Sequence, residues 1–338
     1  MTPNQSRQYG VEIIGSGNGL PAKRLTNADL VKMMDTSEEW IVQRTGIEER
    51  RVTDWDNGEK TATLATKALR NAVDDAGIKP GDLDLIIVAT MTPNMPTPSV
   101  SCLVAADLGC TGIAAIDFNA ACSGFVFSIS AVHELIKGGM FKTVGLIGAD
   151  CLTQHIDYST EGRTASILFG DGASAVILRR TDDLSKGLIS HAMHADGGGS
   201  DILLIPADKN DHPDPANCLD REVGRVFMNG PAVFKFAVKK FPEVIQETLD
   251  LAGLDADQID HFICHQANAR ILEAARKRFG LSEEKLRINI NKYGNTVAAS
   301  CPLVYNELCT DGSIKPGQRI MFIAFGAGLT WGASLWQL

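Results

Sequence analysis

The feature that most constrains the fold of this chain is an internal repeat. An amphipathic segment, a glycine, a short loop and an apolar run occur at residues 73–87 and again at 249–263, an offset of 249 − 73 = 176 residues. Each copy predicts a helix that ends at a glycine and is followed by a buried strand. A chain that repeats such a unit is expected to fold as two similar α/β halves rather than around one core.

Two further pairs of segments support a duplication. Residues 134–139 resemble residues 307–312, at an offset of 307 − 134 = 173, because both carry Glu-Leu followed by a glycine. Phe169-Gly170-Asp171-Gly172 resembles Phe325-Gly326-Ala327-Gly328, and we interpret both as closing a β-rich run. We therefore expect one half to span residues 1–183 and the other to span residues 187–338.

Length and composition limit the class of protein. The chain has 338 residues, of which 44% are hydrophobic and 22% charged, as is typical of a globular protein with two packed halves. Its net charge of −9 argues against non-specific nucleic-acid binding, which needs a basic surface. The polar start MTPNQSRQYG and the lack of a long apolar run predict no signal peptide, no membrane span and a cytoplasmic location.

Cysteine and histidine spacing predicts neither a disulfide framework nor a metal site. The eight cysteines are scattered and include no CxxC pair, so a reducing compartment is favoured. The seven histidines show no HxxxH or HExxH spacing. We expect no metal.

Cys122 is the strongest candidate for a nucleophile. The apolar run from Ile113 to Phe118 predicts a buried strand, and helical periodicity starts directly after it and ends at Gly138-Gly139. Cys122 is therefore expected at a sharp strand-to-helix turn, where the N–H groups of a helix N-terminus stabilise a thiolate. Its neighbours are small and leave room for a substrate. A buried cysteine that only packs is the alternative interpretation.

Two polar residues of the second half are candidates to act with Cys122. The offset of 173 makes Cys122 equivalent to Asn295, and the offset of 176 makes His265 equivalent to Ala89 at a strand end. If the halves pack about a pseudo-twofold axis, these turns can meet at one site, because ligands bind beyond the carboxyl ends of strands in α/β sheets. A neutral asparagine could donate a hydrogen bond to an oxyanion. A core histidine and a plain Gly-Asn turn are the alternatives.

Two glycine-rich segments invite a functional interpretation. The segment from Gly15 to Pro21 resembles a dinucleotide fingerprint, but Leu20 stands where glycine is required and Pro21 would interrupt the helix, so we predict a turn. The loop Gly326-Ala327-Gly328 predicts either tight sheet packing or a backbone N–H that, with the N–H of Cys122, points at a thioester oxygen.

Basic residues gather in two segments of this acidic chain. They form either a solvated helix face or a docking surface for an acidic protein. They are Lys235, Lys239, Lys240, Arg270, Arg276, Lys277 and Arg278.

Several motifs in order resemble one known family. The chain resembles the 3-oxoacyl-[acyl-carrier-protein] synthase III family, the ketoacyl synthases with a thiolase fold that start bacterial fatty-acid synthesis. The resemblance runs essentially end to end and rests on the following segments: 36–41, 44–47, 120–125, 169–172, 265–268, 293–296 and 325–332.

The resemblance implies a fold, a reaction and a set of site residues. The fold is α/β and thiolase-like, a duplicated five-layered αβαβα architecture. The implied catalytic triad is Cys122, His265 and Asn295, and the implied oxyanion hole consists of the backbone N–H groups of Cys122 and Ala327. The implied CoA-binding and tunnel residues are Trp40, Arg44, Arg163, Phe234, Asn268 and Phe325. The implied docking residues for acyl carrier protein are Lys235, Arg270, Lys277 and Arg278.

The implied reaction is a decarboxylating Claisen condensation without cofactors. The Cys122 thiolate takes an acyl group from acetyl-CoA or a somewhat larger acyl-CoA, and malonyl-carrier protein then loses carbon dioxide and attacks the acyl-cysteine. His265 and Asn295 donate hydrogen bonds to the thioester carbonyl, and we hypothesise that a neutral histidine suits this role. The products are 3-oxoacyl-carrier protein, CoA and carbon dioxide. The family is expected to form a homodimer.

Some positions depart from the family's usual residues. Pro231 replaces a polar residue near the pantetheine, and Val297 and Cys301 replace commoner choices beside Asn295. Thr97 stands on a loop that reaches across the dimer interface in relatives, where a larger residue closes the acyl pocket. A smaller residue there predicts room for a longer or branched primer.

Two alternative functions remain open at this stage. One is a related condensing enzyme or acyltransferase of a quinolone or polyketide pathway, which uses the same triad on another acceptor. The other is a non-catalytic acyl-CoA-binding protein. A biosynthetic thiolase fits less well, because Cys301 and Cys309 do not match its second catalytic cysteine.

Overall fold

The structure is a computed structural model that describes residues 8–338. The start of the chain, for which we predicted no signal peptide, lies mostly outside the described residues. Two mixed β-sheets dominate the fold. No helix among residues 8–338 is both long enough and apolar enough to cross a membrane.

The two main sheets have related strand orders. The strands of the first sheet lie in the order β1 (Gly10–Gly19), β7 (Gly172–Thr181), β6 (Thr143–Asp150), β4 (Leu85–Ala89) and β5 (Ala114–Phe118). The pairs β1–β7 and β7–β6 are antiparallel, and the pairs β6–β4 and β4–β5 are parallel. The second has one parallel and two antiparallel pairings, in the order β11 (His261–Cys264), β12 (Arg319–Gly326), β13 (Thr330–Gln337) and β8 (Gly187–Ala195).

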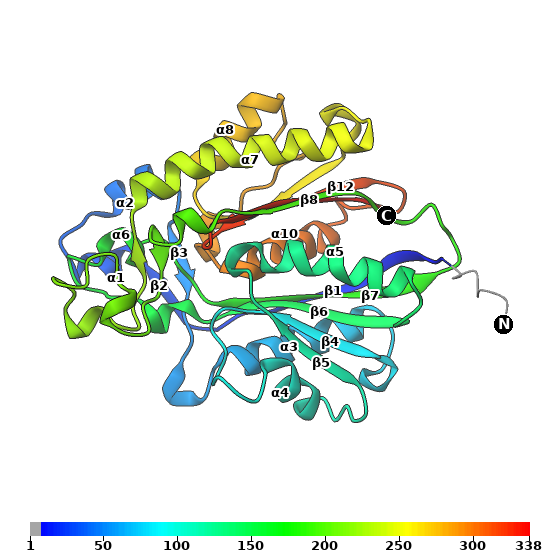
Figure 1. Ribbon diagram of the computed structural model, residues 1–338, viewed down its shortest axis with the longest axis horizontal. Coiled ribbons are helices and arrows are strands. Elements are labelled where there is room, and N and C mark those ends of the chain that lie inside the picture. The colour runs from blue at the N-terminus through cyan, green and yellow to red at the C-terminus, as the bar shows by residue number, and fades with distance from the viewer. Residues whose placement is uncertain (1–7) are drawn as a thin grey trace.

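Helices form three layers around these sheets, and the whole is a five-layered stack (Figure 1). The outer face of the first sheet is covered by α3 (Thr61–Asp75) and α4 (Val100–Asp107), and that of the second by α7 (Gly230–Ala252) and α8 (Ala269–Phe279). Between the sheets lie α5 (Gly124–Lys137) and α10 (Ser300–Thr310).

The remaining elements are short. They are two small ribbons, β2 (Arg24–Thr26) with β3 (Glu49–Arg51) and β9 (Leu203–Leu204) with β10 (Phe227–Met228), and the helices α1 (Asn27–Val31), α2 (Glu38–Thr45), α6 (Arg163–Ser166) and α9 (Ile290–Tyr293).

The central layer explains why α5 is apolar around most of its circumference. A helix between two sheets buries more than one face, so a single apolar stripe is not enough. Phe125, Ile129 and Val132 of α5 are completely buried in a core that draws on both sheets. The ring of Phe125 meets Phe322 of β12 edge to face, with centroids 5.5 Å apart.

The structural repeat follows an offset of 176 residues through the site. It relates β4 to β11, β6 to β12, and the short 3-10 turn Ala121–Ser123 (η3) to Val297–Ala299 (η9). The offset becomes 173 only at the far ends of α5 and α10, because α5 has 14 residues and α10 has 11. Our predicted equivalence of Cys122 with Asn295 is therefore wrong. Cys122 corresponds to Ala298, and Asn295 corresponds to Asn119.

Two other predictions about local structure are also wrong. Residues 15–19 belong to β1 rather than to a turn, and alternate glycines there let α3 lie directly on the strand, since a Cβ on Gly17 would lie 2.4 Å from the Ala72 nitrogen. The predicted equivalence of residues 169–172 with residues 325–328 is the second. Residues 325 and 326 end β12, whereas residue 169 follows the irregular segment after β6, so the two segments occupy different places in the fold.

The strand predicted at residues 113–118 forms as β5 but is not deeply buried. It is the edge strand of the first sheet, and Ile116 is 48% exposed. An apolar side chain on an open edge is unusual, because such edges promote association. The strand therefore contributes less to the core of the single chain than its composition suggested.

Candidate active site

The candidate nucleophile lies on a sharp turn between β5 and α5. Cys122 is the middle residue of η3, and α5 begins two residues later. Ala121 before it has a φ of 46°, in the left-handed region that residues with a side chain rarely adopt. The corresponding Val297 has a φ of 53°. The predicted strand-to-helix turn is confirmed, and it carries backbone strain of the kind often found at functional sites.

His265 follows the end of β11 and is 1% exposed. Its Nδ1 atom lies 2.6 Å from the Ser300 Oγ atom, and its ring meets Phe325 edge to face at 5.6 Å. The Ser300 hydroxyl also lies 3.0 Å from the Val297 carbonyl, to which it can donate. Sequence analysis missed Ser300, because only the fold brings the start of α10 beside β11.

The side chain of Asn295 has a fixed orientation. Its Oδ1 atom accepts a hydrogen bond of 2.9 Å from the N–H of Val297. Its backbone is held on both sides, since its N–H donates to Leu168 and its carbonyl accepts from Gly170. The Oδ1 atom is thus occupied and the Nδ2 group is available to donate into the cavity. Asn119 makes the same bond to Ala121 in the first half, at 3.2 Å.

The backbone around Cys122 leaves two N–H groups available. Within residues 8–338, neither the Cys122 N–H nor the Ala327 N–H donates to a protein acceptor. Gly326 packs directly on the turn, since a Cβ there would lie 2.8 Å from the Cys122 Cβ. Any side chain at position 326 would therefore displace the nucleophile, which explains the glycine.

One cavity brings the candidate residues together. It has a volume of about 370 Å³ and is lined by Cys122, His265, Asn295 and Phe325, so side chains from both halves meet at one site. A short apolar extension of about 30 Å³ continues past Cys122 between Met91 and Val297. This is a partly open, mostly apolar pocket with a few convergent polar groups, as expected for a small-molecule site.

Burial sets the protonation states of the site. Burial and, to a smaller extent, the nearby Asp150 carboxylate together raise the pKa of the Cys122 thiol to about 12, and the residue's own N–H opposes this rise. Burial also lowers the pKa of His265 to about 3. Our expectation of a thiolate stabilised by the helix N-terminus is therefore wrong for the ligand-free site, because desolvation of the sulfur outweighs the dipole. A neutral thiol faces a neutral imidazole.

The mouth of the cavity is aromatic and basic. The guanidinium groups of Arg44 and Arg163 lie 5.1 and 5.2 Å from the ring centre of Trp40, which is half-buried. Asn268 caps α8 through a bond to the N–H of Arg270, and its Nδ2 donates to the Arg44 carbonyl at 3.0 Å. Asn268 thus joins α2 to α8 across the entrance.

The structure separates the other predicted site residues. Phe234 and Pro231 line the cavity from the start of α7, and Val297 lines its apolar extension, whereas the buried thiol of Cys301 is directed at the Ile323 carbonyl. Thr97 is exposed and lines neither the cavity nor the extension of its own chain. A role for Thr97 in the acyl pocket therefore requires a second copy of the chain.

The predicted docking residues do not form one uniform patch. Lys235 and Arg270 lie exposed at the starts of α7 and α8, and Arg270 also lines the cavity mouth. Lys277 is exposed on the groove between α8 and α2. Arg278 instead faces a groove lined by the carboxylates Glu243, Glu247 and Asp250. The first three residues therefore suit an acidic partner better than Arg278 does.

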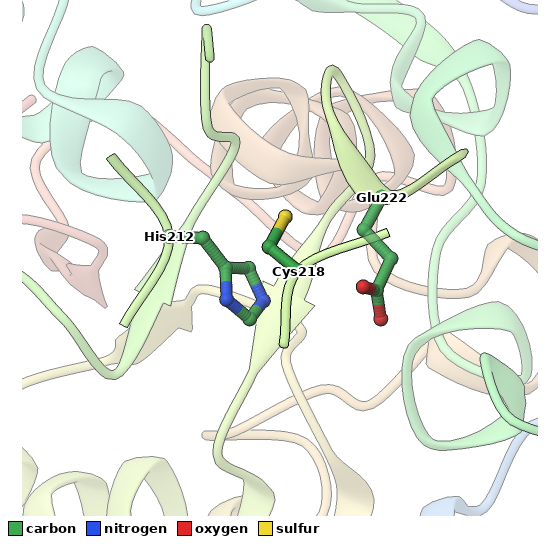
Figure 2. Close-up of side chains that lie close together, drawn as sticks. All are labelled: His212, Cys218 and Glu222. Carbon is green, nitrogen blue, oxygen red and sulfur yellow. The ribbon is translucent and has the colours of Figure 1, made fainter. Parts of the chain in front are cut away.

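The loop between β9 and β10 lines the apolar extension with its two ends, Ile205 and Val226, and contains a group of polar side chains. His212, Cys218 and Glu222 lie within 4.8 Å of one another (Figure 2). The Glu222 carboxylate accepts from the Leu219 N–H at 2.7 Å, and His212 Nδ1 lies 3.1 Å from the N–H of Asp214. These side chains brace the loop through its own backbone, and we assign them that role rather than a metal.

Comparison with known proteins agrees with this geometry. The chain matches the family described as 3-oxoacyl-[acyl-carrier-protein] synthase III over residues 116–197 and the C-terminal part of that family over residues 249–338. It is 45% identical over 323 residues to a β-ketoacyl-[acyl-carrier-protein] synthase III of Caldanaerobacter subterraneus subsp. tengcongensis, which covers 96% of each chain. The chain belongs to the 3-oxoacyl-[acyl-carrier-protein] synthase III family.

Solved structures of this family confirm the predicted thiolase-like fold. The synthase III of Aquifex aeolicus VF5 matches with a TM-score of 0.88 and 41% identity, over 97% of this chain and 100% of that chain. The priming β-ketosynthase of a polyketide biosynthetic pathway matches with a TM-score of 0.90 and 30% identity, over 100% and 99% of the two chains. The match to the synthase III structure thus covers 97% of this chain.

The protonation states predict how the Cys122 thiol reacts with pH. Because its pKa is raised, the thiolate fraction should grow about tenfold per pH unit from pH 8 to pH 10 without reaching a plateau. Asp150 is the charged group that raises the pKa of this thiol in addition to burial. The rate of iodoacetamide alkylation at Cys122, followed by peptide mass spectrometry, measures this dependence.

The exposed Cys102 provides the internal control for this measurement. Its labelling shows that the reagent reaches an exposed thiol of the same protein under each condition. A plateau for Cys122 below pH 8 would show a thiolate–imidazolium pair instead of the neutral pair inferred here.

Proposed function

We propose that the chain condenses an acyl-CoA primer with malonyl-acyl carrier protein and so starts fatty-acid synthesis. The observation that carries this proposal is that Cys122, His265 and Asn295 line one cavity, with the free backbone N–H groups of Cys122 and Ala327 beside it. A thiol, a neutral imidazole, an amide donor and an oxyanion hole are the groups that acyl transfer and enolate stabilisation require.

In the first half-reaction the Cys122 sulfur attacks the carbonyl carbon of the primer thioester. The thiol loses its proton as the C–S bond forms, and the neutral His265 imidazole can accept it. The N–H groups of Cys122 and Ala327 then hold the oxyanion, a contribution of ~3 kcal/mol for each donor. The bond to CoA breaks, the proton passes to the leaving sulfur, and CoA departs with the acyl group left on Cys122.

In the second half-reaction malonyl-carrier protein enters and its carboxylate leaves as carbon dioxide. The electron pair of the broken bond forms an enolate, whose oxygen accepts hydrogen bonds from His265 and from the Asn295 Nδ2 group. The enolate carbon attacks the acyl-cysteine, the acyl C–S bond breaks, and the Cys122 sulfur takes up a proton from solvent. The neutral state of His265, which burial enforces, suits a group that donates without holding a permanent charge.

Ser300 lets His265 serve in both half-reactions. When the Ser300 hydroxyl donates to the Val297 carbonyl, Nδ1 carries the proton of the imidazole and Nε2 can accept from the thiol. Between the two steps the imidazole takes up a proton at Nε2 and releases the Nδ1 proton to solvent. The hydroxyl then turns to donate to Nδ1, and the Nε2–H group can donate to the enolate oxygen. We propose that this switch of one hydroxyl selects the tautomer for each step.

The shape of the cavity supports the choice of substrates. The apolar extension past Cys122 has a volume of about 30 Å³, which favours a short primer such as acetyl-CoA. Trp40 with its two flanking arginines suits the adenine and phosphates of CoA. Both substrates are water-soluble, so we place the reaction in the cytoplasm.

We also propose that residues 1–183 and 187–338 are the duplicated halves.

The chain is proposed to act as a homodimer that associates at the edge strand β5. Ile116 is 48% exposed on that edge, and Thr97 lies exposed on the loop between β4 and α4. We expect Ile116→Lys to convert the dimer to a monomer, because a desolvated lysine at the interface is costly. Light scattering during size-exclusion chromatography measures the mass. As a control, Leu184→Lys should leave the dimer intact, because Leu184 lies between the halves and is 68% exposed. A wild-type protein that is a monomer would contradict the proposal.

The decisive test of function separates the two half-reactions. Intact-protein mass spectrometry after incubation with a panel of acyl-CoAs should show one added acyl group on the wild type, most completely for short primers, and none on Cys122→Ala. Asn295→Asp should still be acylated, because the new carboxylate keeps the bond from Val297 but has no proton to donate. Its condensation with malonyl-carrier protein should be at least about 100-fold slower.

Asn119→Asp is the matched control for this experiment, because Asn119 occupies the same turn in the first half and is exposed. It should leave both steps within about threefold of wild type, as expected for a surface substitution. Absence of any acyl adduct on the wild type would contradict the proposed function. An adduct that reacts with another acceptor but not with malonyl-carrier protein would instead support a related condensing enzyme, such as the polyketide priming ketosynthase that shares this fold.

The proposed carrier-protein surface gives a graded prediction. Lys235→Glu and Lys277→Glu should each raise the KM for malonyl-carrier protein about fivefold, which corresponds to about 1 kcal/mol for a rim charge. Arg278→Glu should have a smaller effect, because carboxylates already surround Arg278. Steady-state kinetics at low ionic strength measures these changes. Lys79→Glu, on the opposite outer layer, should change nothing, and equal effects from all four variants would refute this surface.

A further inference from the structure

A buried carboxylate lies beside the site and has no place in the reaction described above. Asp150 ends β6, is completely buried and faces no cationic partner within hydrogen-bond distance among residues 8–338. Its Oδ1 atom accepts from the Met91 N–H at 2.9 Å and from the hydroxyls of Thr90 and Thr92 at 3.2 and 3.0 Å. Its Oδ2 atom accepts from the Ala298 N–H at 3.2 Å. Burial raises the pKa of this carboxyl group to about 7, and its four hydrogen-bond donors oppose that shift. A buried carboxyl group that accepts four hydrogen bonds indicates a specific role.

The structural repeat shows what this carboxylate replaces. The offset of 176 residues relates Ala298 to Cys122 and Asp150 to Gly326. In the first turn, Gly326 has no side chain and the Cys122 N–H stays free to hold a substrate oxyanion. In the second turn, Asp150 fills the corresponding place, and its own oxygen accepts from the corresponding N–H. Asp150 thus gives the second turn a permanent hydrogen-bond acceptor, whereas the first turn keeps its N–H for a substrate oxygen.

The turn that Asp150 holds carries the groups proposed to stabilise the enolate. Val297, the residue before Ala298, donates its N–H to Asn295 Oδ1 and accepts from the Ser300 hydroxyl through its carbonyl. Ser300 in turn contacts His265 Nδ1. The orientation of both proposed donors therefore depends on the backbone of one strained turn, in which Val297 has a φ of 53°.

We propose that Asp150 is a positioning residue for the condensation step, which fixes the turn at residues 297–299 and through it the donor groups of Asn295 and His265. This proposal rests on the proposed function. It predicts a selective effect. The turn at residues 121–123, which carries the nucleophile for acyl loading, makes no hydrogen bond to Asp150. Removal of the Asp150 charge would lower the pKa of the Cys122 thiol, which does not slow its attack on the primer.

Asp150→Asn tests the proposal with a change of one atom. The amide oxygen can keep the three donors at the Oδ1 position, whereas the Nδ2 group would face the Ala298 N–H and lose that bond alone. We expect condensation of the pre-acylated enzyme to slow about tenfold, while acyl loading does not slow by more than about twofold. Quenched-flow measurement of each step by intact mass, with KM and kcat for malonyl-carrier protein, separates these effects.

Asp171→Asn is a matched control. Asp171 is also completely buried, and one of its oxygens accepts three donors from Thr53 and Thr153 while the other accepts the Thr153 N–H. It touches neither turn, so its substitution should leave the ratio of the two rates unchanged even if it lowers the melting temperature. Equal slowing of both steps by Asp150→Asn, or the same rate ratio in both variants, would overturn the proposal.

A second variant keeps the test valid if Asp150→Asn does not fold. Ala298→Gly retains the N–H and the bond to Asp150 but loosens the backbone of the turn. It should also slow condensation more than loading, and an unchanged ratio would count against the proposal. A wild-type enzyme that neither loads nor condenses would refute the proposed function itself, whereas a fully active wild type with unselective variants would refute only the role of Asp150.

Discussion

The packing of two sharp turns against each other between the sheets is the constraint on which the rest of the structure depends. Ala121 and Val297 both adopt a left-handed backbone conformation, although neither is a glycine. Each turn starts a central helix, and those helices bury several faces against both sheets. The surrounding core therefore stabilises a backbone that would be unfavourable by itself. The proposed nucleophile and the proposed amide donor owe their positions to this pair of turns.

Burial at the turns also decides the electrostatics of the site. A helix N-terminus favours an anion by up to ~2 kcal/mol in partly buried geometries. Complete desolvation disfavours the charged form by several pKa units. Desolvation prevails for Cys122, whose pKa rises to about 12, and for His265, whose pKa falls to about 3. The Cys122 thiol and the His265 imidazole are therefore both neutral before a substrate binds. The free N–H groups stabilise the negative charge that develops on the substrate carbonyl oxygen in the transition state.

Much of the fold could be predicted from the sequence, because hydrophobic periodicity and glycine stops mark elements within a few residues. The repeat predicted two halves, and the strand-to-helix turn at Cys122 and the strand end at His265 lie where the pattern indicated. The exact equivalence failed because α10 is three residues shorter than α5, and no residue in either helix marks where the difference falls. The predicted turn at residues 15–19 failed because only the packed α3 reveals why a strand should carry alternate glycines.

The residues that sequence analysis missed are those defined by contacts between distant segments. Ser300 meets His265 across 35 residues, and Asp150 meets Ala298 across 148 residues. Serine at a helix start and aspartate at a strand end are common, so their types carry no signal until the halves are packed. The thiolate prediction failed for a related reason. The position of Cys122 at a helix N-terminus is a local property, whereas its desolvation is a property of the closed cavity.

A duplicated fold with two equivalent turns poses the question of why it has one proposed site rather than two. The answer lies at two equivalent strand ends. Gly326 ends β12 without a side chain and leaves the first turn open, whereas Asp150 ends β6 with a carboxylate and closes the second. A free N–H pair binds a transient oxyanion, and an N–H that is already bonded gives only rigidity. The same backbone geometry can therefore serve binding in one half and support in the other. The difference depends on two pairs of equivalent residues, Gly326 and Asp150 at the strand ends and Cys122 and Ala298 at the turns.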